Sequence, residues 1–172
     1  MKCQNLNRKG GKFDTLNTKT AFKCSQMFEW DEYFTIDMVA TKESVWEFMV
    51  TPNEWHVWDT DIKSVKFHEP IDKNNLEDKG GRLFMANGRE FDFVVKGLKT
   101  NSYFQYITNH PGATAHWYWK IEPSSSNVES VAFTMGVRWE GYAALLYKTL
   151  LRSTVVVALE TCSKNLKVLA EK

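Results

Sequence analysis

The sequence has little cysteine and no long apolar run, and both absences limit what the protein can be. Cys3, Cys24 and Cys162 are an odd number of thiols, at spacings that match no metal-binding motif. We therefore expect a reduced, intracellular chain, and we predict that it is cytoplasmic. Because no apolar run reaches about 18 residues, we expect no transmembrane segment. Residues 1–26 also lack the apolar stretch of a signal peptide.

Familiar catalytic and cofactor motifs are missing as well. The histidines are His56, His68, His110 and His116. No two of them have the spacing of a helical zinc site. No glycine-rich phosphate loop occurs around Gly80 and Gly81, and Ser124–Ser126 lacks the pattern of a nucleophile elbow. We expect no metal and no cofactor, and no motif names a catalytic residue.

Charge is unevenly distributed along the chain. Residues 1–27 hold six basic side chains against Asp14 alone, a net charge of +5, so the total of +1 leaves −4 for the remainder. A mildly acidic folded part argues against nucleic-acid binding. Residues 1–26 show no amphipathic period and are polar and basic, so we predict a flexible extension followed by one domain over residues 27–172.

Apolar and polar residues alternate beyond Met27, which predicts strands with one buried face. In the first strand Trp30, Phe34, Ile36 and Met38 share a face. Six further strands are predicted at residues 62–71, 82–86, 90–98, 102–108, 113–121 and 128–139.

Three segments have helical spacing instead. A first short helix is predicted to start at Thr41–Ser44 and to stop at Thr51-Pro52-Asn53, and a second covers residues 53–58. The segment 142–170 has no glycine or proline and is too long for a strand. It has an apolar stripe made of Tyr147, Leu151, Val155, Ala158, Cys162, Leu166 and Leu169.

This order of elements predicts an α+β fold. We expect a curved, seven-stranded antiparallel sheet with two short helices, and a long C-terminal helix over its concave face. One helix cannot fill so long a sheet, so we also expect a gap beneath the two short helices. Mid-strand Arg82, Asp92 and Arg138 are expected on the convex, solvated face, and His116 should face away from Trp117 and Trp119.

The chain from Met27 to Lys172 resembles the START-like (SRPBCC) superfamily, which has the helix-grip fold and includes polyketide cyclases and birch-pollen-allergen proteins. Val45-Trp46 followed by Pro52, Trp55 and Trp58-Asp59 carries the resemblance, together with the Gly80-Gly81 pair that opens a strand. The resemblance implies a cavity between the sheet and the long helix. The residues implied to line it are Trp46, Trp58, Phe67, Phe84, Phe93, Trp117, Phe133, Tyr147 and Leu151.

The fold by itself leaves several functions open. The resemblance implies binding of a hydrophobic or aromatic small molecule, lipid- or polyketide-like. One alternative is an enzyme similar to the cyclases and dehydratases, and another is a protein-interaction module similar to co-chaperones. A hydrophobic small molecule is the expected partner, and the sequence leaves the oligomeric state undefined.

Overall fold

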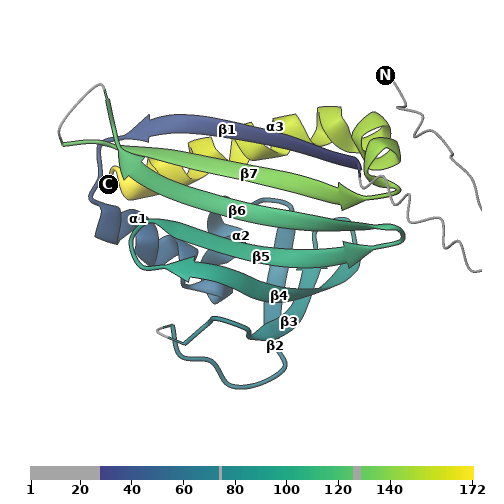
Figure 1. Cartoon of the computed structure of the whole chain (residues 1–172). Coiled ribbons are helices and arrows are strands. Elements are labelled where there is room, and N and C mark those ends of the chain that lie inside the picture. The colour runs from purple at the N-terminus through teal and green to yellow at the C-terminus, as the bar shows by residue number, and fades with distance from the viewer. Residues whose placement is uncertain (1–27, 74, 126–128) are drawn as a thin grey trace, which may run out of the picture.

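The computed structural model describes residues 28–73, 75–125 and 129–172 (Figure 1). The elements in chain order are β1 (Phe28–Met38), α1 (Lys42–Met49), the short 3-10 helix η1 (Pro52–Glu54), α2 (Trp55–Trp58), β2 (Ile62–Phe67), β3 (Gly80–Met85), β4 (Glu90–Lys99), β5 (Tyr103–His110), β6 (Ala113–Pro123), β7 (Val131–Gly141) and α3 (Ala144–Ala170). The predicted flexible extension, residues 1–26, lies outside the described residues and stays a prediction.

The seven strands form one antiparallel sheet in the order β1-β7-β6-β5-β4-β3-β2. Strands β2 to β7 follow one another as a meander, and β1 pairs with the last strand, with Phe28 opposite Gly141. The sheet curves strongly, and α3 lies behind β1 and β7 in Figure 1. This arrangement confirms the predicted α+β fold, with the long helix on the concave face.

The two short helices begin and end for identifiable reasons. Thr41 caps α1, because its Oγ1 accepts a hydrogen bond from the Ser44 N–H at 3.1 Å. The single turn of α2 holds Trp55 and Trp58, three residues apart and both fully buried. The turn ends where the Asp59 N–H donates to the Trp55 carbonyl at 2.8 Å.

The long helix α3 buries the face that its apolar stripe predicts. Val155, Cys162 and Leu166 are buried, and Leu151 is half-buried. Leu159 is also buried, although the predicted stripe did not include it. The helix therefore covers the sheet with one continuous face.

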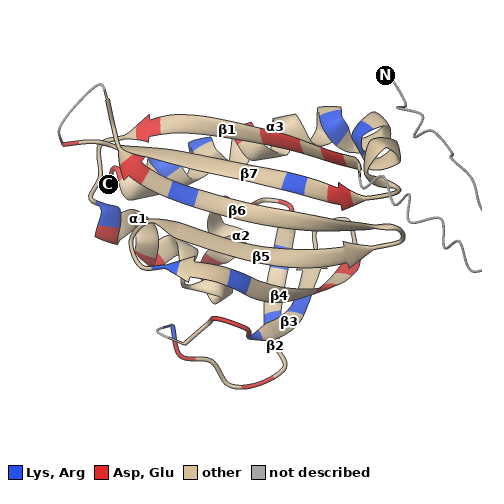
Figure 2. Cartoon of the chain, viewed as in Figure 1, with Lys and Arg blue, Asp and Glu red and all other residues tan. Residues whose placement is uncertain are grey.

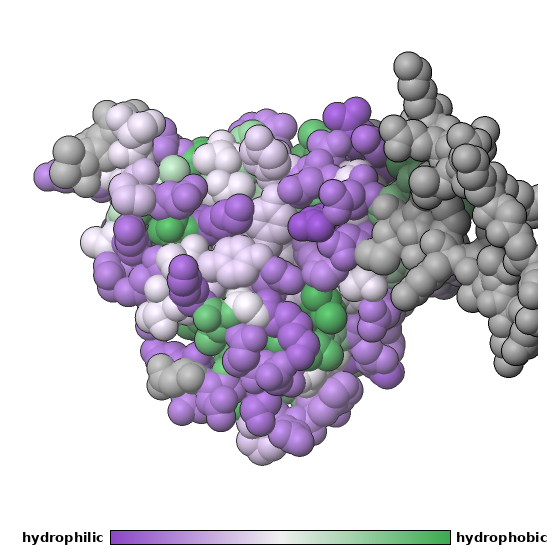
Figure 3. Space-filling view, viewed as in Figure 1, coloured by the Kyte–Doolittle hydropathy of each residue, from purple (hydrophilic) through white to green (hydrophobic). Residues whose placement is uncertain are grey.

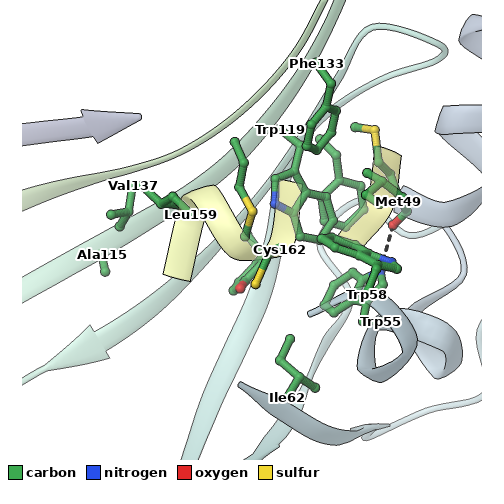
Figure 4. Close-up of a cluster of buried hydrophobic side chains, with 14 of the residues drawn as sticks. Met49, Trp55, Trp58, Ile62, Ala115, Trp119, Phe133, Val137, Leu159 and Cys162 are labelled. Atoms are coloured by element: carbon green, nitrogen blue, oxygen red, sulfur yellow. Dashed lines mark hydrogen bonds between the residues drawn. The ribbon is translucent and has the colours of Figure 1, made fainter. Parts of the chain in front are cut away.

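A cluster of indole rings fills the space beneath α1 and α2 (Figure 4). The Trp55 ring meets Trp119 edge-on at 5.0 Å between centroids, and Trp58 meets the same ring at 5.1 Å. Trp55 Nε1 donates to the Met49 carbonyl at 3.0 Å. The expected gap beneath the short helices is therefore wrong, because these large side chains occupy that space.

The convex face of the sheet is mostly polar, with hydrophobic patches between the polar side chains (Figures 2 and 3). Arg82 donates to Asp92 at 2.8 Å across β3 and β4, and Arg138 donates to Glu29 at 2.7 Å. His116 lies on the same side, with its Nδ1 at 3.1 Å from Gln105 Nε2. These positions confirm the predicted outward direction of Arg82, Asp92, Arg138 and His116.

Strand β2 ends at Phe67, whereas the alternation predicted a strand continuing to Ile71. The ladder stops shortly before Pro70, which has no N–H to donate to a neighbouring strand. The predicted strand is too long because the apolar spacing continues past the last paired residue.

Adjacent glycines at the start of β3 provide a test of this packing. A Cβ at Gly81 would lie 2.6 Å from the Lys66 carbonyl oxygen and 2.8 Å from the Phe93 ring, whereas a Cβ at Gly80 meets nothing closer than 3.4 Å. We expect Gly81→Ala to lower the free energy of unfolding by about 1–3 kcal/mol. Gly80→Ala should change it by less than about 1 kcal/mol. Urea unfolding measures both, and equal midpoints would contradict the register of β2 and β3.

Candidate functional site

A partly enclosed cavity of about 170 Å³ lies between the sheet and the middle of α3. Its apolar lining comes from strands β3, β4, β6 and β7, from α3 and from the first residue of β2. These residues are Ile62, Leu83, Met85, Phe91, Trp117, Met135, Trp139, Leu151, Val155, Ala158 and Leu159. The polar lining residues are Asp59, Asp61, Tyr106, Thr108, His110, Thr154 and Cys162.

The alternation of side chains along β5 and β6 determines which of their residues line the cavity. Tyr106 lies opposite Trp117, and Thr108 opposite Ala115, in the ladder between β5 and β6. Paired residues share a face of the sheet, so this ladder directs Tyr106, Thr108 and Trp117 into the cavity together. The Tyr106 and Trp117 rings stack at 6.3 Å between centroids.

One end of the cavity is formed by the buried carboxyl group of Asp59. Its Oδ1 accepts hydrogen bonds from the Asp61 N–H at 3.1 Å and from the Cys162 thiol at 3.4 Å. Burial raises the pKa of the Asp59 carboxyl to about 6, and the neighbouring Asp61 carboxylate raises it further. Among the described lining residues none is lysine or arginine, so no cationic side chain of the cavity neutralises this group.

Two further groups at this end stay neutral. Burial raises the pKa of Tyr106 well above its usual range, and it also raises the pKa of the Cys162 thiol. Cys162 is therefore a hydrogen-bond donor to Asp59 and not a thiolate nucleophile.

Three hydrogen-bonded side chains form another part of the wall. Thr108 Oγ1 accepts from Trp117 Nε1 at 3.2 Å and lies 2.9 Å from His110 Nε2. Burial lowers the pKa of His110, so its imidazole is neutral near pH 7. The described residues contain no group of three or more side chains that could hold a metal ion.

An outer groove adjoins the cavity at α3. The groove and the cavity share three lining residues, Asp61, Thr154 and Ala158. Asp61 and Thr154 are exposed. The gap between α3 and the start of β2 is therefore one place where the cavity approaches solvent.

Trp117 and Leu151 are the two predicted lining residues that do line the cavity. Tyr147 lies just outside the lining, with its ring stacked on Trp139 at 4.7 Å between centroids. Phe84 is on the opposite face of β3 from Leu83, which lines the cavity. The prediction for Phe84 is wrong because a shift of one residue reverses the face of a strand.

The other predicted residues belong to the packed core outside the cavity lining: Trp46, Trp58, Phe67, Phe93 and Phe133. Neighbouring rings cover several of them. Phe93 meets Trp55 at 6.2 Å and Phe67 at 5.2 Å between centroids. Alternation identifies which side chains point inward, but it does not distinguish those facing another side chain from those facing empty space.

The prediction missed Asp59, Tyr106 and His110. The two-residue turn at Pro111-Gly112 pairs His110 with Ala113 and fixes the register of β5 and β6. Extending that register from Trp117 would have identified Tyr106. Asp59 follows a single helical turn, where no periodic pattern reveals a buried carboxyl group.

The raised pKa of Asp59 predicts a specific dependence of stability on pH. The folded state holds this proton up to about pH 6, whereas the unfolded chain releases it near pH 3.9. Ionisation therefore lowers the free energy of unfolding as pH rises through this window. Because Asn cannot ionise, we expect the stability of Asp59→Asn relative to wild type to rise by about 2–3 kcal/mol between pH 4 and pH 7. Urea unfolding at several pH values measures the difference, and a pH-independent difference would contradict it.

Comparison with known proteins places this geometry in a structural class. No family model matches the sequence, and no curated protein sequence matches it. Norcoclaurine synthase from Thalictrum flavum, in complex with dopamine and hydroxybenzaldehyde, matches with a TM-score of 0.63 at 7% identity, covering 93% of this chain and 96% of that chain.

Two other solved structures are similar. A START superfamily protein from Mycobacterium smegmatis has a TM-score of 0.62 at 16% identity, covering 82% of this chain and 97% of that one. The di-domain ARO/CYC protein StfQ from the steffimycin biosynthetic pathway has a TM-score of 0.62 at 13% identity, covering 83% of this chain and 51% of that one.

At these identities the likeness concerns the fold. In the described part of the chain no helix combines the length and apolar character needed to cross a membrane. The curved antiparallel sheet, the long C-terminal helix and the solved structures agree that this chain has the START-like helix-grip fold.

Proposed function

We propose that this protein binds a small, largely apolar aromatic molecule in the cavity between the sheet and α3. The observation that carries the proposal is an unfilled space of about 170 Å³ lined mainly by aromatic and aliphatic side chains. Apolar pockets with a few placed polar groups are typical small-molecule sites. The matching structure of norcoclaurine synthase, in complex with dopamine and hydroxybenzaldehyde, supports this use of the fold.

The volume limits the ligand. A dry apolar cavity of about 150 Å³ in another protein binds benzene. The present space is only slightly larger, and it lies below the roughly 300–1,000 Å³ of ordinary ligand pockets. A single aromatic ring therefore fits better than a multi-ring polyketide or a long lipid.

The flat rings of the wall favour such a ligand. Trp117, Trp139 and Phe91 line the cavity, and the Phe91 ring lies 5.1 Å from the His110 ring between centroids. Aromatic pairs contribute about 0.5–1.5 kcal/mol beyond the area they bury. A ligand ring has partners in strands β4, β6 and β7.

Binding of benzene, toluene and fluorobenzene tests the proposal. We expect each to raise the melting temperature of the full chain in proportion to concentration, because a ligand that binds only the folded state stabilises it. Fluorine NMR of fluorobenzene should show exchange between free and bound signals. The absence of both effects for all three compounds would contradict the proposal.

A cavity-filling variant locates the binding. Ala158 lines the cavity from α3, so Ala158→Leu places additional carbon atoms in the space. We expect this change to weaken toluene binding at least about tenfold, the equivalent of 1.4 kcal/mol, while stability is kept. Val156 is 40% exposed on the same helix and does not line the cavity, so Val156→Leu is the matched control and should bind like wild type. Equal affinity in all three proteins would place the binding elsewhere.

A further inference from the structure

One oxygen of the buried Asp59 carboxyl group, Oδ2, accepts no hydrogen bond from any side chain of the described residues. Oδ1 accepts both of its side-chain hydrogen bonds, from Asp61 and Cys162. No described side chain donates to Oδ2, although the Ile62 N–H is close enough to the carboxyl group to lower its pKa. Asp59 is only 5% exposed and lines the cavity, so its carboxyl group borders the cavity.

The Tyr106 hydroxyl is a second polar group at the same end. The residue is 4% exposed and lines the cavity, yet its hydroxyl makes no hydrogen bond to the described part of the chain. Its ring is held by Trp55, stacked at 5.5 Å, and by Trp119 at 5.8 Å between centroids. A polar group buried in this way is costly unless something binds it.

The lining residues that can carry charge at this end of the cavity are acidic. Asp61 is a second carboxylate in the lining, and none of the described lining residues is lysine or arginine. His110, farther along the wall, is neutral near pH 7 because burial lowers its pKa. The cavity therefore disfavours an anionic ligand and favours a cationic one.

We propose that the ligand is an organic cation, a single-ring arylalkylamine whose ammonium group donates hydrogen bonds to Asp59 Oδ2 and to the Tyr106 oxygen. This inference rests on the proposed function, because the ring of the amine occupies the apolar part of the cavity. Two of the three ammonium N–H donors find acceptors in these two oxygens. The aromatic wall adds a favourable cation–π contribution.

The groups facing Asp59 set the pH dependence. They are Asp61 from the preceding turn, Cys162 from α3 and Tyr106 from β5. Burial keeps Cys162 and Tyr106 neutral, whereas the Asp59 carboxyl has a pKa of about 6. An amine that stays protonated should bind more tightly as pH rises through 6, because Asp59 then becomes a carboxylate.

Three probes of similar shape test the charge: benzylamine, toluene and benzoate, measured by calorimetry on the full chain. At pH 7.5 we expect benzylamine to bind about tenfold to a hundredfold more tightly than toluene, in keeping with a charge-assisted hydrogen bond. Benzoate should bind least. Between pH 7.5 and pH 5, benzylamine affinity should fall about tenfold, while toluene affinity stays within about twofold.

Matched variants assign the effect to Asp59. Asp59→Asn should reduce benzylamine affinity about tenfold or more and leave toluene affinity nearly unchanged. Asp61→Asn changes an exposed residue and should have a smaller effect. Asp92→Asn, on the convex face, is the control and should bind benzylamine like wild type. If Asp59→Asn does not fold, the wild-type pH series and Asp61→Asn decide the question.

The two proposals fail in different ways. If toluene binds as tightly as benzylamine, the proposal of a cationic ligand is wrong. It is also wrong if benzylamine affinity is unchanged between pH 5 and pH 7.5. In both cases the apolar cavity remains the proposed binding site. If none of the probes binds, including toluene, both proposals are overturned.

Discussion

The buried indole of Trp55 joins the parts of this molecule that lie far apart in sequence. Its ring contacts Phe93 of β4, Tyr106 of β5 and Trp119 of β6. Its Nε1 donates to the last residue of α1. These contacts hold the short helices against the middle of the sheet. Because this cluster fills one end of the concave space, the remaining volume lies at the other end, beneath α3.

The burial of the α2 tryptophans also positions the polar end of the cavity. Asp59 follows α2 directly, so burial of Trp55 and Trp58 draws its carboxyl group inward as well. Cys162 on α3 and the N–H of Asp61 stabilise one carboxyl oxygen, and no described side chain donates to the other. Burying a carboxylate without a cation is unfavourable for folding. The proposed ammonium ligand would offset the free-energy cost of burying the Asp59 carboxylate. The site is in this sense complementary to a cation.

Much of the fold could be predicted from local sequence. Alternating residues such as Trp30, Ile36 and Met38 identify a strand and its buried face. Thr41 marks the start of α1, and the apolar stripe from Val155 to Leu166 identifies the covered face of α3. These features depend on the geometry of one strand or one helix, which each residue and its near neighbours determine.

The candidate site depends on contacts between elements, and the sequence alone determined only part of it. It identified Trp117 and Leu151 as inward residues, and both line the cavity. It could not separate Trp117 from Trp58, since both are inward-facing indoles and only tertiary packing leaves one beside empty space and covers the other. The burial of the Asp59 carboxyl group and its contact with Cys162 also appear only in three dimensions. Whether a buried group has a partner depends on side chains up to 103 positions away in the chain, and no local pattern encodes that distance.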